Sequence, residues 1–408
     1  MKRLIWIGCL SYFLIGLAHV VLGSVLPVLL EHYGREYSEG GTLIFTQFAG
    51  FLGGVLVSPI LNKKFGKRGG LLIAVSMLCA AELAYMLLLP WEWLYPIAAC
   101  AGFGFGMIEA VIGTIIIAAI KEKTAVAMSR LEVLFGVGAM VMPLIASGMI
   151  TQGLWRFSFL VISLFALVTL LFWSKSSFGE TINAELGVKK ATASLSGSDS
   201  MPKKAFPYQG KSLWILLMFM LFFFIYVGTE MSLANFMPAI LIEKIGMKEA
   251  GAALSVTCFW VAMSIGRIFA GTIAERIHYR VYVFVSCIAA LILLAIFPFT
   301  ASIWSSFVVI LLLGLFMSGI FSIALVFASK MLAGSEESTP SILIASGGVG
   351  GALIPLLTGW SMDHLKVNQT SWMLALFTLF MVILSFAAFQ IQRKQRGYKE
   401  QQVIQAGL

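Results

Sequence analysis

The chain has 408 residues, of which 60% are hydrophobic and only 12% are charged. Soluble domains are about half apolar and about a quarter charged, so this composition excludes an ordinary soluble domain. The net charge of +9 lies mainly in segments between apolar runs, which indicates a membrane protein and not a nucleic-acid-binding surface.

The apolar residues form runs of about twenty residues, long enough for a helix to cross roughly 30 Å of hydrocarbon. Lipid cannot satisfy an open backbone, so each run is predicted to be a helix. The first run is too long for a signal peptide and is predicted to remain in the protein. The twelve predicted spans are 4–29, 42–62, 70–90, 94–120, 126–150, 155–173, 213–241, 250–275, 281–299, 303–332, 340–362 and 371–391.

Basic residues gather in alternate connections. They follow the second run at Lys63–Arg68, fill the Ser- and Lys-rich stretch 174–212, and end the chain at 393–408. By the positive-inside rule these segments and both termini are predicted to be cytoplasmic. The protein is therefore predicted to be a multi-pass protein of the cell (plasma) membrane.

One phrase occurs twice, as Gly136-Val137-Gly138 with Pro143 and as Gly348-Val349-Gly350 with Pro355, 212 residues later. A chain built from two parallel membrane repeats uses corresponding helices for the same packing. The predicted fold is an all-α membrane protein with twelve transmembrane helices in two six-helix pseudo-symmetric halves. The boundaries are 1–173 and 213–392 for the halves, 174–212 for a cytoplasmic linker, and 393–408 for a tail.

Two carboxyl groups lie deep in predicted spans. Glu109 is twelve residues from Lys121, or about 18 Å along a helix, and Glu230 is nineteen residues past Lys211. Ionisable residues in such places are costly and are functional candidates by default, so both are predicted to carry or sense a proton. The alternative is that each is a structural acid bonded to a neighbouring helix. Glu82, near the outer end of the third run, is expected to reach the headgroups.

Four further residues are predicted to bind solute. Gln47 offers both a donor and an acceptor, and Trp260 offers an aromatic face for stacking. Asn235 follows Glu230 by five residues and shares its face only if the helix is distorted before Pro238. His19 is the remaining candidate, although a lone histidine in an apolar helix is more often a satisfied structural group.

The turn after the eighth run resembles the G-x-x-x-[D/E]-R-x-x-x-R loop of the major facilitator superfamily. Gly271, Glu275, Arg276 and Arg280 carry this resemblance, while Lys63 stands where the first copy of the loop has an acid in that family. The resemblance implies a cytoplasmic gate made of Glu275, Arg276 and Arg280. Arg267 is predicted to pair with an acid near this gate. Glu132, at the start of the fifth run, is predicted to belong to the gate or its interface.

More narrowly, the sequence resembles the fucose and glucose/mannose–proton symporters of that superfamily. The segments that carry the likeness are Gln47–Leu56, Ile108–Ala110, Leu131–Gly136, Glu230–Pro238, Phe259–Val261 and Gly266–Arg267. Fucose symporters have a proton-linked helix-four glutamate that Glu109 matches, whereas Gly23 or Ser24 stands in the place of their helix-one aspartate.

These features predict proton-coupled uptake of a monosaccharide or similar small polar solute by alternating access. The alternative is a proton-driven exporter of drugs or a small metabolite, which the 32 Phe and 20 Met residues favour. No phosphate-binding loop, metal cluster or enzymatic motif is present in the sequence, so no cofactor, metal, ATP or enzymatic activity is predicted. The expected partners are a small-molecule substrate, the proton and the lipid bilayer, with the protein acting as a monomer and binding no nucleic acid.

Overall fold

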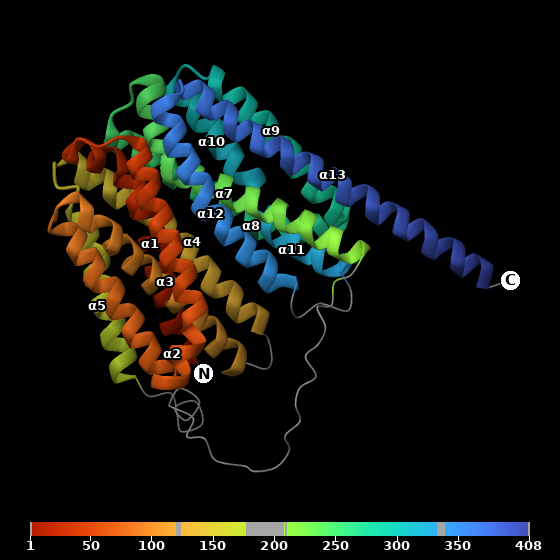
Figure 1. Ribbon diagram of the computed structural model, residues 1–408, viewed down its shortest axis with the longest axis horizontal. Coiled ribbons are helices and arrows are strands. Elements are labelled where there is room, and N and C mark those ends of the chain that lie inside the picture. The colour runs from red at the N-terminus through yellow and green to blue at the C-terminus, as the bar shows by residue number, and fades with distance from the viewer. Residues whose placement is uncertain (1, 120–123, 177–207, 209, 333–338, 407–408) are drawn as a thin grey trace, which may run out of the picture. The chain divides into compact units, whose positions relative to one another are not determined.

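The computed structural model describes residues 2–119, 124–176, 208, 210–332 and 339–406, and helices dominate all of the longer segments. The first five helices are α1 (Lys2–Tyr33), α2 (Tyr37–Met86), α3 (Trp91–Ala119), α4 (Thr124–Thr151) and α5 (Phe157–Lys175). Then follow α7 (Lys211–Ile245), α8 (Glu249–Ile277), α9 (Tyr279–Ile296), a 3-10 turn (Phe297–Phe299), α10 (Ile303–Met317), α11 (Ile320–Met331), α12 (Thr339–His364) and α13 (Val367–Ala406). The prediction of an all-helical membrane protein is confirmed for the described residues, which contain no strand (Figure 1).

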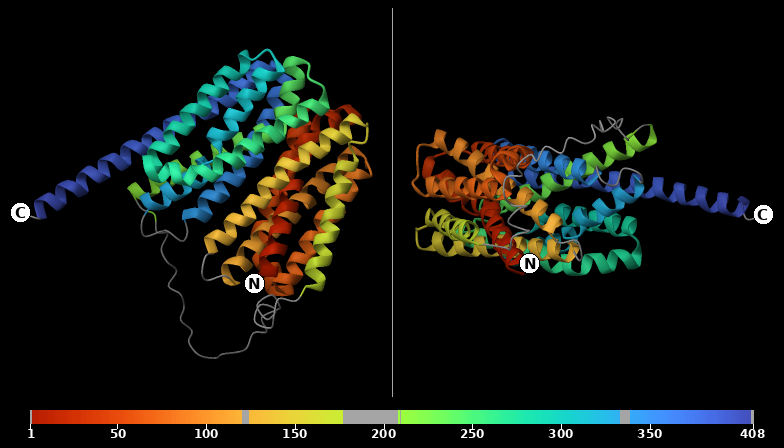
Figure 2. Two further views of the ribbon diagram at one scale, coloured as in Figure 1. Left: turned by 180° about the vertical axis from the view of Figure 1, so that it is seen from behind. Right: turned by 90° about the horizontal axis from the view of Figure 1, so that it is seen from below.

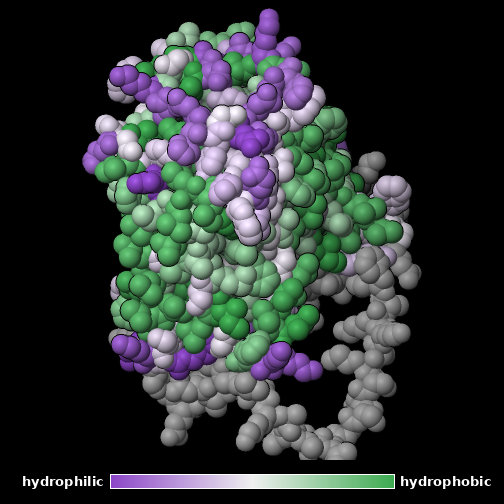
Figure 3. Space-filling model, turned by 60° about the vertical axis from the view of Figure 1, so that its left-hand side comes forward, coloured by the Kyte–Doolittle hydropathy of each residue, from purple (hydrophilic) through white to green (hydrophobic). Residues whose placement is uncertain are grey.

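Eleven helical stretches in the described residues are long and apolar enough to cross a membrane, judged by length and composition. The predicted runs 42–62 and 70–90 fall largely in α2, whose 50 residues form two helices that meet at a kink at the non-helical Gly66. The last predicted run, 371–391, continues as helix α13 to Ala406. Figure 3 shows the exposed side chains of one face, where a broad apolar band separates two hydrophilic ends.

The helices cluster into two compact units. Unit 1 comprises the described residues within Met1–Asp199, Met231–Val261 and Pro355–Val367. Unit 2 comprises those within Ser200–Glu230, Ala262–Ile354 and Asn368–Leu408, so α7, α8 and α12 each contribute a segment to both units. In unit 1, α2 packs against α3 and α5, and α1 packs against α4, as the view from behind shows (Figure 2). Most of the predicted linker 174–212 lies outside the described residues.

The two glycine phrases form matching helix crossings, one inside each unit. In unit 1 a Cβ on Gly138 of α4 would collide with the carbonyl oxygen of Phe13 in α1. In unit 2 a Cβ on Gly350 of α12 would collide with the carbonyl oxygen of Phe224 in α7. Small residues let helix backbones approach this closely in a membrane. The repeated phrase therefore has a packing role in both units.

The turns after the corresponding second helices also match. Gly66 has φ 74° and ψ 161°, and His278, 212 positions later, has φ 74° and ψ 138°. A positive φ is easily adopted by glycine but is uncommon for other residues. The same backbone turn therefore recurs 212 positions later, with glycine at the first position and histidine at the second.

We expect Gly350→Ala to destabilise the protein by about 1–3 kcal/mol, because the new methyl group meets helix backbone that cannot move aside cheaply. Gly271→Ala is the matched control, since nothing lies within 4 Å of a Cβ at that helical position of unit 2. Thermal unfolding in detergent should give a melting temperature lower by several degrees for Gly350→Ala and unchanged or slightly higher for Gly271→Ala. Equal melting temperatures would refute the close crossing.

Candidate functional site

His19 of α1 lies in an aromatic cluster of unit 1. Its ring centroid is 5.3 Å from that of Phe48, 5.6 Å from Phe105 and 5.5 Å from Phe135, all in edge-on arrangements. Its Nε2 lies 3.0 Å from the Sδ atom of Met231 in α7. Aromatic rings and a thioether are weak partners for an imidazole, so this site surrounds the histidine with soft, mainly apolar contacts.

The other three predicted solute-binding residues also belong to unit 1 and are buried. Trp260 is 1% exposed, and its ring lies 5.8 Å from Phe135, which links it to the cluster around His19. Asn235 donates from Nδ2 to the carbonyl oxygen of Met231 one turn earlier, at 2.8 Å. Gln47 is 4% exposed on α2, the helix that also supplies Phe48. Unit 1 thus brings His19 and Trp260 near one another through Phe135.

Asn235 marks a close contact between α1 and α7 in unit 1. A Cβ on Gly23 would stand 2.5 Å from the Cα atom of Asn235 and 2.7 Å from its Oδ1 atom. Gly23 is one of the two residues that stand in place of the helix-one aspartate of the fucose symporters. It lies at a helix crossing, where the absence of a side chain lets α7 approach α1. Part of the Asn235 amide is already used within its own helix, which leaves its Oδ1 atom facing α1.

Glu109 of α3 is half-buried and lies in unit 1. It interacts electrostatically with Glu132 of α4, and both carboxyl groups also interact with Tyr12 of α1. The Tyr12 hydroxyl lies 3.9 Å from the position of a Cβ on Gly113, one turn beyond Glu109. Three helices therefore bring two acids and a phenol into one neighbourhood. Glu132 itself is exposed, whereas Glu109 is half-buried.

Glu230 of α7 is the acid of a second polar cluster, inside unit 2. It is 5% exposed, and its Oε1 atom lies 3.7 Å from an Nη atom of Arg267 in α8. The hydroxyl of Tyr226, one turn before Glu230, is hydrogen-bonded to the same carboxyl group. The acid that Arg267 meets is thus Glu230 in the middle of α7, and not Glu275 at the end of α8.

Tyr226 connects the Glu230 cluster to a third helix. Its hydroxyl also lies 3.0 Å from the carbonyl oxygen of Met317 in α10, to which it can donate. A phenol has only one proton to donate. When Tyr226 donates to Met317, a bond to Glu230 requires the carboxyl group to be the donor and hence protonated. When Glu230 is ionised, Tyr226 can donate to it instead, so the tyrosine responds to the charge on Glu230.

The predicted gate residues lie at the end of α8 and the start of α9. Glu275 and Arg276 are exposed in the last turn of α8, and Arg280 is half-buried in the first turn of α9. They are separate from the Glu230–Arg267 pair, and among the described residues none of them forms an ion pair within 4.0 Å. Their gating role stays a prediction.

Within unit 1, Asp363 near the end of α12 binds the first residues of α2. Its carboxylate accepts hydrogen bonds from the backbone N–H groups of Tyr37, at 2.9 Å, and Ser38, at 2.6 Å. The Tyr37 hydroxyl donates to Glu243 of α7 at 3.0 Å. A carboxylate at a helix N-terminus satisfies unpaired amides and complements the positive end of the helix dipole. Asp363 therefore caps α2 from a different helix.

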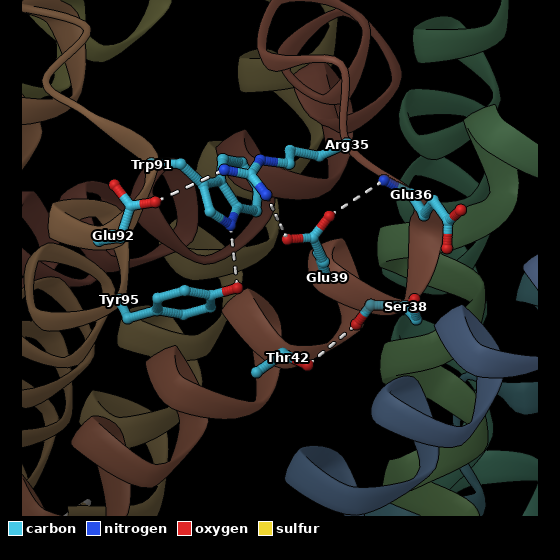
Figure 4. Close-up of polar contacts among 8 residues, drawn as sticks. All are labelled: Arg35, Glu36, Ser38, Glu39, Thr42, Trp91, Glu92 and Tyr95. Carbon is cyan, nitrogen blue, oxygen red and sulfur yellow. Dashed lines mark hydrogen bonds and ion pairs between the residues drawn. The ribbon is translucent and has the colours of Figure 1, made fainter.

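A charged cluster stands beside this contact (Figure 4). Arg35 lies between the carboxyl groups of Glu39, at 3.1 Å, and Glu92, at 3.5 Å. Its guanidinium is 5.6 Å from the ring of Trp91, whose indole N–H donates to Tyr95 at 2.9 Å. Exposed pairs of this kind contribute little stability each, but together they fix the connection between α1 and α2.

Several residues of these clusters were not among the sequence predictions. Tyr226 has a local signal, since a tyrosine one helical turn before a buried glutamate can reach it. Met231, Phe48, Phe105 and Asp363 have none, because their roles depend on which helices become neighbours. The expectation that Glu82 reaches the headgroups is wrong, because its side chain is only 1% exposed and packs inside unit 1.

The sequence matches the family profile described as Major Facilitator Superfamily over residues 8–335 and 218–403. It is 33% identical over 390 residues to the glucose/mannose transporter GlcP of Bacillus subtilis (strain 168), covering 95% of this chain and 94% of that protein. It is also 31% identical over 150 residues to a glucose/galactose transporter of Brucella abortus, covering 36% of this chain and 35% of that protein.

Solved structures share the fold. The D-xylose-proton symporter superposes with a TM-score of 0.73 at 12% identity, covering 95% of this chain and 97% of that chain. The transporter FucP in its outward conformation superposes with a TM-score of 0.61 at 16% identity, covering 94% and 98%. At these identities the likeness concerns the fold alone.

Proposed function

Because this chain belongs to the Major Facilitator Superfamily, we propose that it takes up a monosaccharide or similar small polar solute together with protons, by alternating access. Like its relatives, the chain is a transporter and not an enzyme. The observation that carries the substrate class is the 33% identity to a glucose/mannose transporter over nearly the whole length of both proteins. We propose that the protein lies in the plasma membrane and acts as a monomer.

The proposed topology has twelve spans in two six-helix halves, 1–173 and 213–392, joined by the linker 174–212 and followed by the tail 393–408. The break at Gly66 supports it by dividing α2 into two spans. The pair α10 and α11 also supports the topology, because together they form one apolar stretch, Ile303–Met331, and therefore count as a single span. Matching glycine crossings and turns 212 residues apart are what a parallel repeat predicts.

The topology predicts that a cysteine introduced at Ser198, in the linker, resists a membrane-impermeant thiol reagent in intact cells. A cysteine at Ser38, at the start of α2, should react because that end faces outward. Both are placed in a background without the five native cysteines, and labelling after cell lysis controls for expression. Labelling of the Ser198 cysteine as fast as the Ser38 cysteine in intact cells would contradict an even number of spans with internal ends.

In the proposed coupling, Glu109 and Glu230 bind or sense the proton. The neighbouring Glu132 gives Glu109 a carboxyl partner, and sharing one proton relieves the repulsion between two such charges. Glu230 alternates between an ionised state that attracts Arg267 and a protonated state that donates to Tyr226. Protonation therefore loosens the contact between α7 and α8, which is a change that transport can use.

In the proposed solute site, Gln47, Asn235, Trp260 and His19 supply one aromatic face and polar groups. Sugar rings have apolar faces that stack on aromatic rings and hydroxyl groups that need hydrogen-bonding partners. The burial of Gln47, Asn235 and Trp260 supports this, because polar groups in a dry site discriminate strongly between ligands that do and do not bond them.

The proposed outer latch consists of Tyr37, Ser38, Asp363 and Glu243. Two glycines tighten it, since a Cβ on Gly41 would lie 3.1 Å from the carbonyl oxygen of Leu356 and one on Gly359 would lie 3.0 Å from the Cα atom of Gly41. Outward opening must separate α2 from α12 and so release Asp363. Glu275, Arg276 and Arg280 are the proposed gate on the cytoplasmic side, and Arg267 and Glu132 are proposed to link this gate to the coupling acids Glu230 and Glu109.

We expect Asp363→Ala to open the outer latch more often, because two backbone N–H groups of α2 lose their acceptor. A cap contributes about 0.5–2 kcal/mol, so a cysteine introduced at Leu43, 0% exposed on α2, should react roughly 2- to 30-fold faster with an external maleimide. Asp363→Asn should give an intermediate rate, because its single amide oxygen can accept from only one of the two N–H groups that the carboxylate binds through separate oxygens. The latch is refuted if both variants label at the parental rate.

A proton-driven exporter of hydrophobic compounds remains the second candidate. The specific observation in its favour is the cluster of Phe48, Phe105 and Phe135 around His19, since aromatic cavities tolerate varied apolar ligands. A thermal-shift screen of the purified protein separates the two functions, because a ligand stabilises the state that it binds. Stabilisation by glucose or mannose supports uptake of sugars, whereas stabilisation by hydrophobic cations alone would overturn it.

A further inference from the structure

A hollow of about 310 Å³ opens at the end of α8, within unit 2, and two of the predicted gate residues, Glu275 and Arg280, belong to its lining. Four segments line it: the end of α8 with Glu275, the turn at His278 with the start of α9, α11 with Lys330, and α13 with Gln392. Pockets of this size are large enough for a small ligand group. The hollow lies where helices end, which places it at the level of a membrane surface.

Two cations of this hollow are held in place by aromatic rings. The Nζ atom of Lys330 lies 4.3 Å from the ring centroid of Tyr279, and the guanidinium carbon of Arg280 lies 5.0 Å from that of Phe389. Such contacts fix the side chains without neutralising them. Within the described residues neither cation forms an ion pair within 4.0 Å, and the nearby Glu275 forms none either. Among the residues that the structure describes, these two positioned positive charges therefore have no ion-pair partner.

The backbone adds to the same positive field. The positive φ of 74° at His278 turns the chain sharply from α8 into α9, and no side chain caps the first turn of α9. The positive end of the α9 dipole consequently faces the segment that lines the hollow. Arg280, Lys330 and Glu275 together give a net charge of +1 with His278 neutral. This charge matches one anionic group.

We propose that the hollow binds a phosphate group, and that the singly charged phosphodiester of a phospholipid headgroup fits it best. The guanidinium of Arg280 suits bidentate contact with phosphate oxygens, and the ammonium of Lys330 adds a point charge. Glu275 disfavours a second negative charge, which weakens binding of a doubly charged phosphate. The position beside the predicted gate residues Glu275, Arg276 and Arg280 makes lipid at this point a regulator of the cytoplasmic end of α8 and α9.

The test measures binding of short-chain lipids to the delipidated full-length protein in detergent by thermal shift. Dioctanoyl-phosphatidylglycerol should stabilise the wild type, and dioctanoylglycerol, which lacks the phosphate, should not. Lys330→Gln and Arg280→Gln should each weaken lipid binding by about 3- to 10-fold, because each removes one charged contact. Lys330→Arg should restore it, which separates loss of a charge from misfolding. Lys248→Gln is the matched control, since Lys248 is exposed at the opposite end of α8.

Inorganic phosphate forms the second arm of the test. If it stabilises the wild type in a Lys330-dependent manner as strongly as the lipid does, the site takes a soluble phosphate, and the assignment to a lipid headgroup is overturned. Equal lipid binding by wild type, Lys330→Gln and Arg280→Gln, or equal stabilisation by dioctanoylglycerol, overturns the phosphate site altogether.

Discussion

Replacing Glu109 by glutamine is expected to abolish uphill accumulation of the solute while leaving exchange of solute down its own gradient. Glutamine imitates the protonated acid and cannot release a proton, so the carrier can still reorient but can no longer couple. The structure strengthens this expectation, because Glu109 interacts with a second carboxyl group, Glu132, and with the Tyr12 hydroxyl, so its charge is felt by α1 and α4. The expected loss is at least tenfold in the steady-state accumulation ratio.

The measurement compares pH-gradient-driven accumulation with counterflow in the same vesicles. Glu82→Gln is the matched control, since Glu82 is another buried carboxyl group of unit 1 but lies outside the proposed site. It should retain accumulation. If Glu109→Gln accumulates solute like the wild type, Glu109 is a packing residue and the proton must be carried elsewhere.

The second large effect concerns Glu230 compared with His19. Glu230→Gln should weaken solute binding, or flatten its pH dependence, far more than His19→Gln does. Glu230 contacts the charged Arg267 and the Tyr226 hydroxyl, whereas His19 contacts aromatic rings and a sulfur atom. If the solute bonds to the Glu230 carboxylate, losing that bond to a charged group costs about 1.5–3 kcal/mol, which is roughly 10- to 100-fold in affinity. We expect less than about threefold for His19→Gln.

Tyr226→Phe and Arg267→Gln complete this test. If Glu230 acts through both partners, each single change should alter the pH dependence of binding, and combining either with Glu230→Gln should add little further effect. Binding titrations of the purified variants across the pH range provide the readout. Unchanged titrations in Glu230→Gln together with a collapse in His19→Gln would move the polar site to the cluster around His19.

The sequence supplies most of the fold because membrane helices are long and their patterns are local. Hydropathy places the spans within a few residues, and the repeated glycine phrase identifies the crossings that Gly138 and Gly350 make. The Lys- and Gly-rich turn at Gly66 interrupts the apolar pattern, and the backbone is non-helical at that residue, so the local sequence also marks the kink that divides α2.

The candidate site is less predictable because it depends on which helices become neighbours. The depth of Glu230 follows from counting residues, and Tyr226 is one turn away, but the pairing with Arg267 requires the packing of α7 against α8. His19 meets Met231, which lies 212 positions later in the sequence, the same spacing as between the two glycine phrases. The cap that Asp363 provides for α2 joins residues more than three hundred positions apart, at 2.9 Å and 2.6 Å, and no local pattern encodes it.

Transport by the purified protein in proteoliposomes tests the central claim most directly. Radiolabelled glucose and mannose are supplied outside vesicles whose interior is made alkaline, and the external pH is followed at the same time. The account predicts that label accumulates above its external concentration only when the gradient is present, that the medium becomes more alkaline as it does so, and that Glu109→Gln shows neither effect. Passive equilibration of sugar regardless of the gradient, or gradient-driven movement of hydrophobic cations with no sugar accumulation, would contradict it.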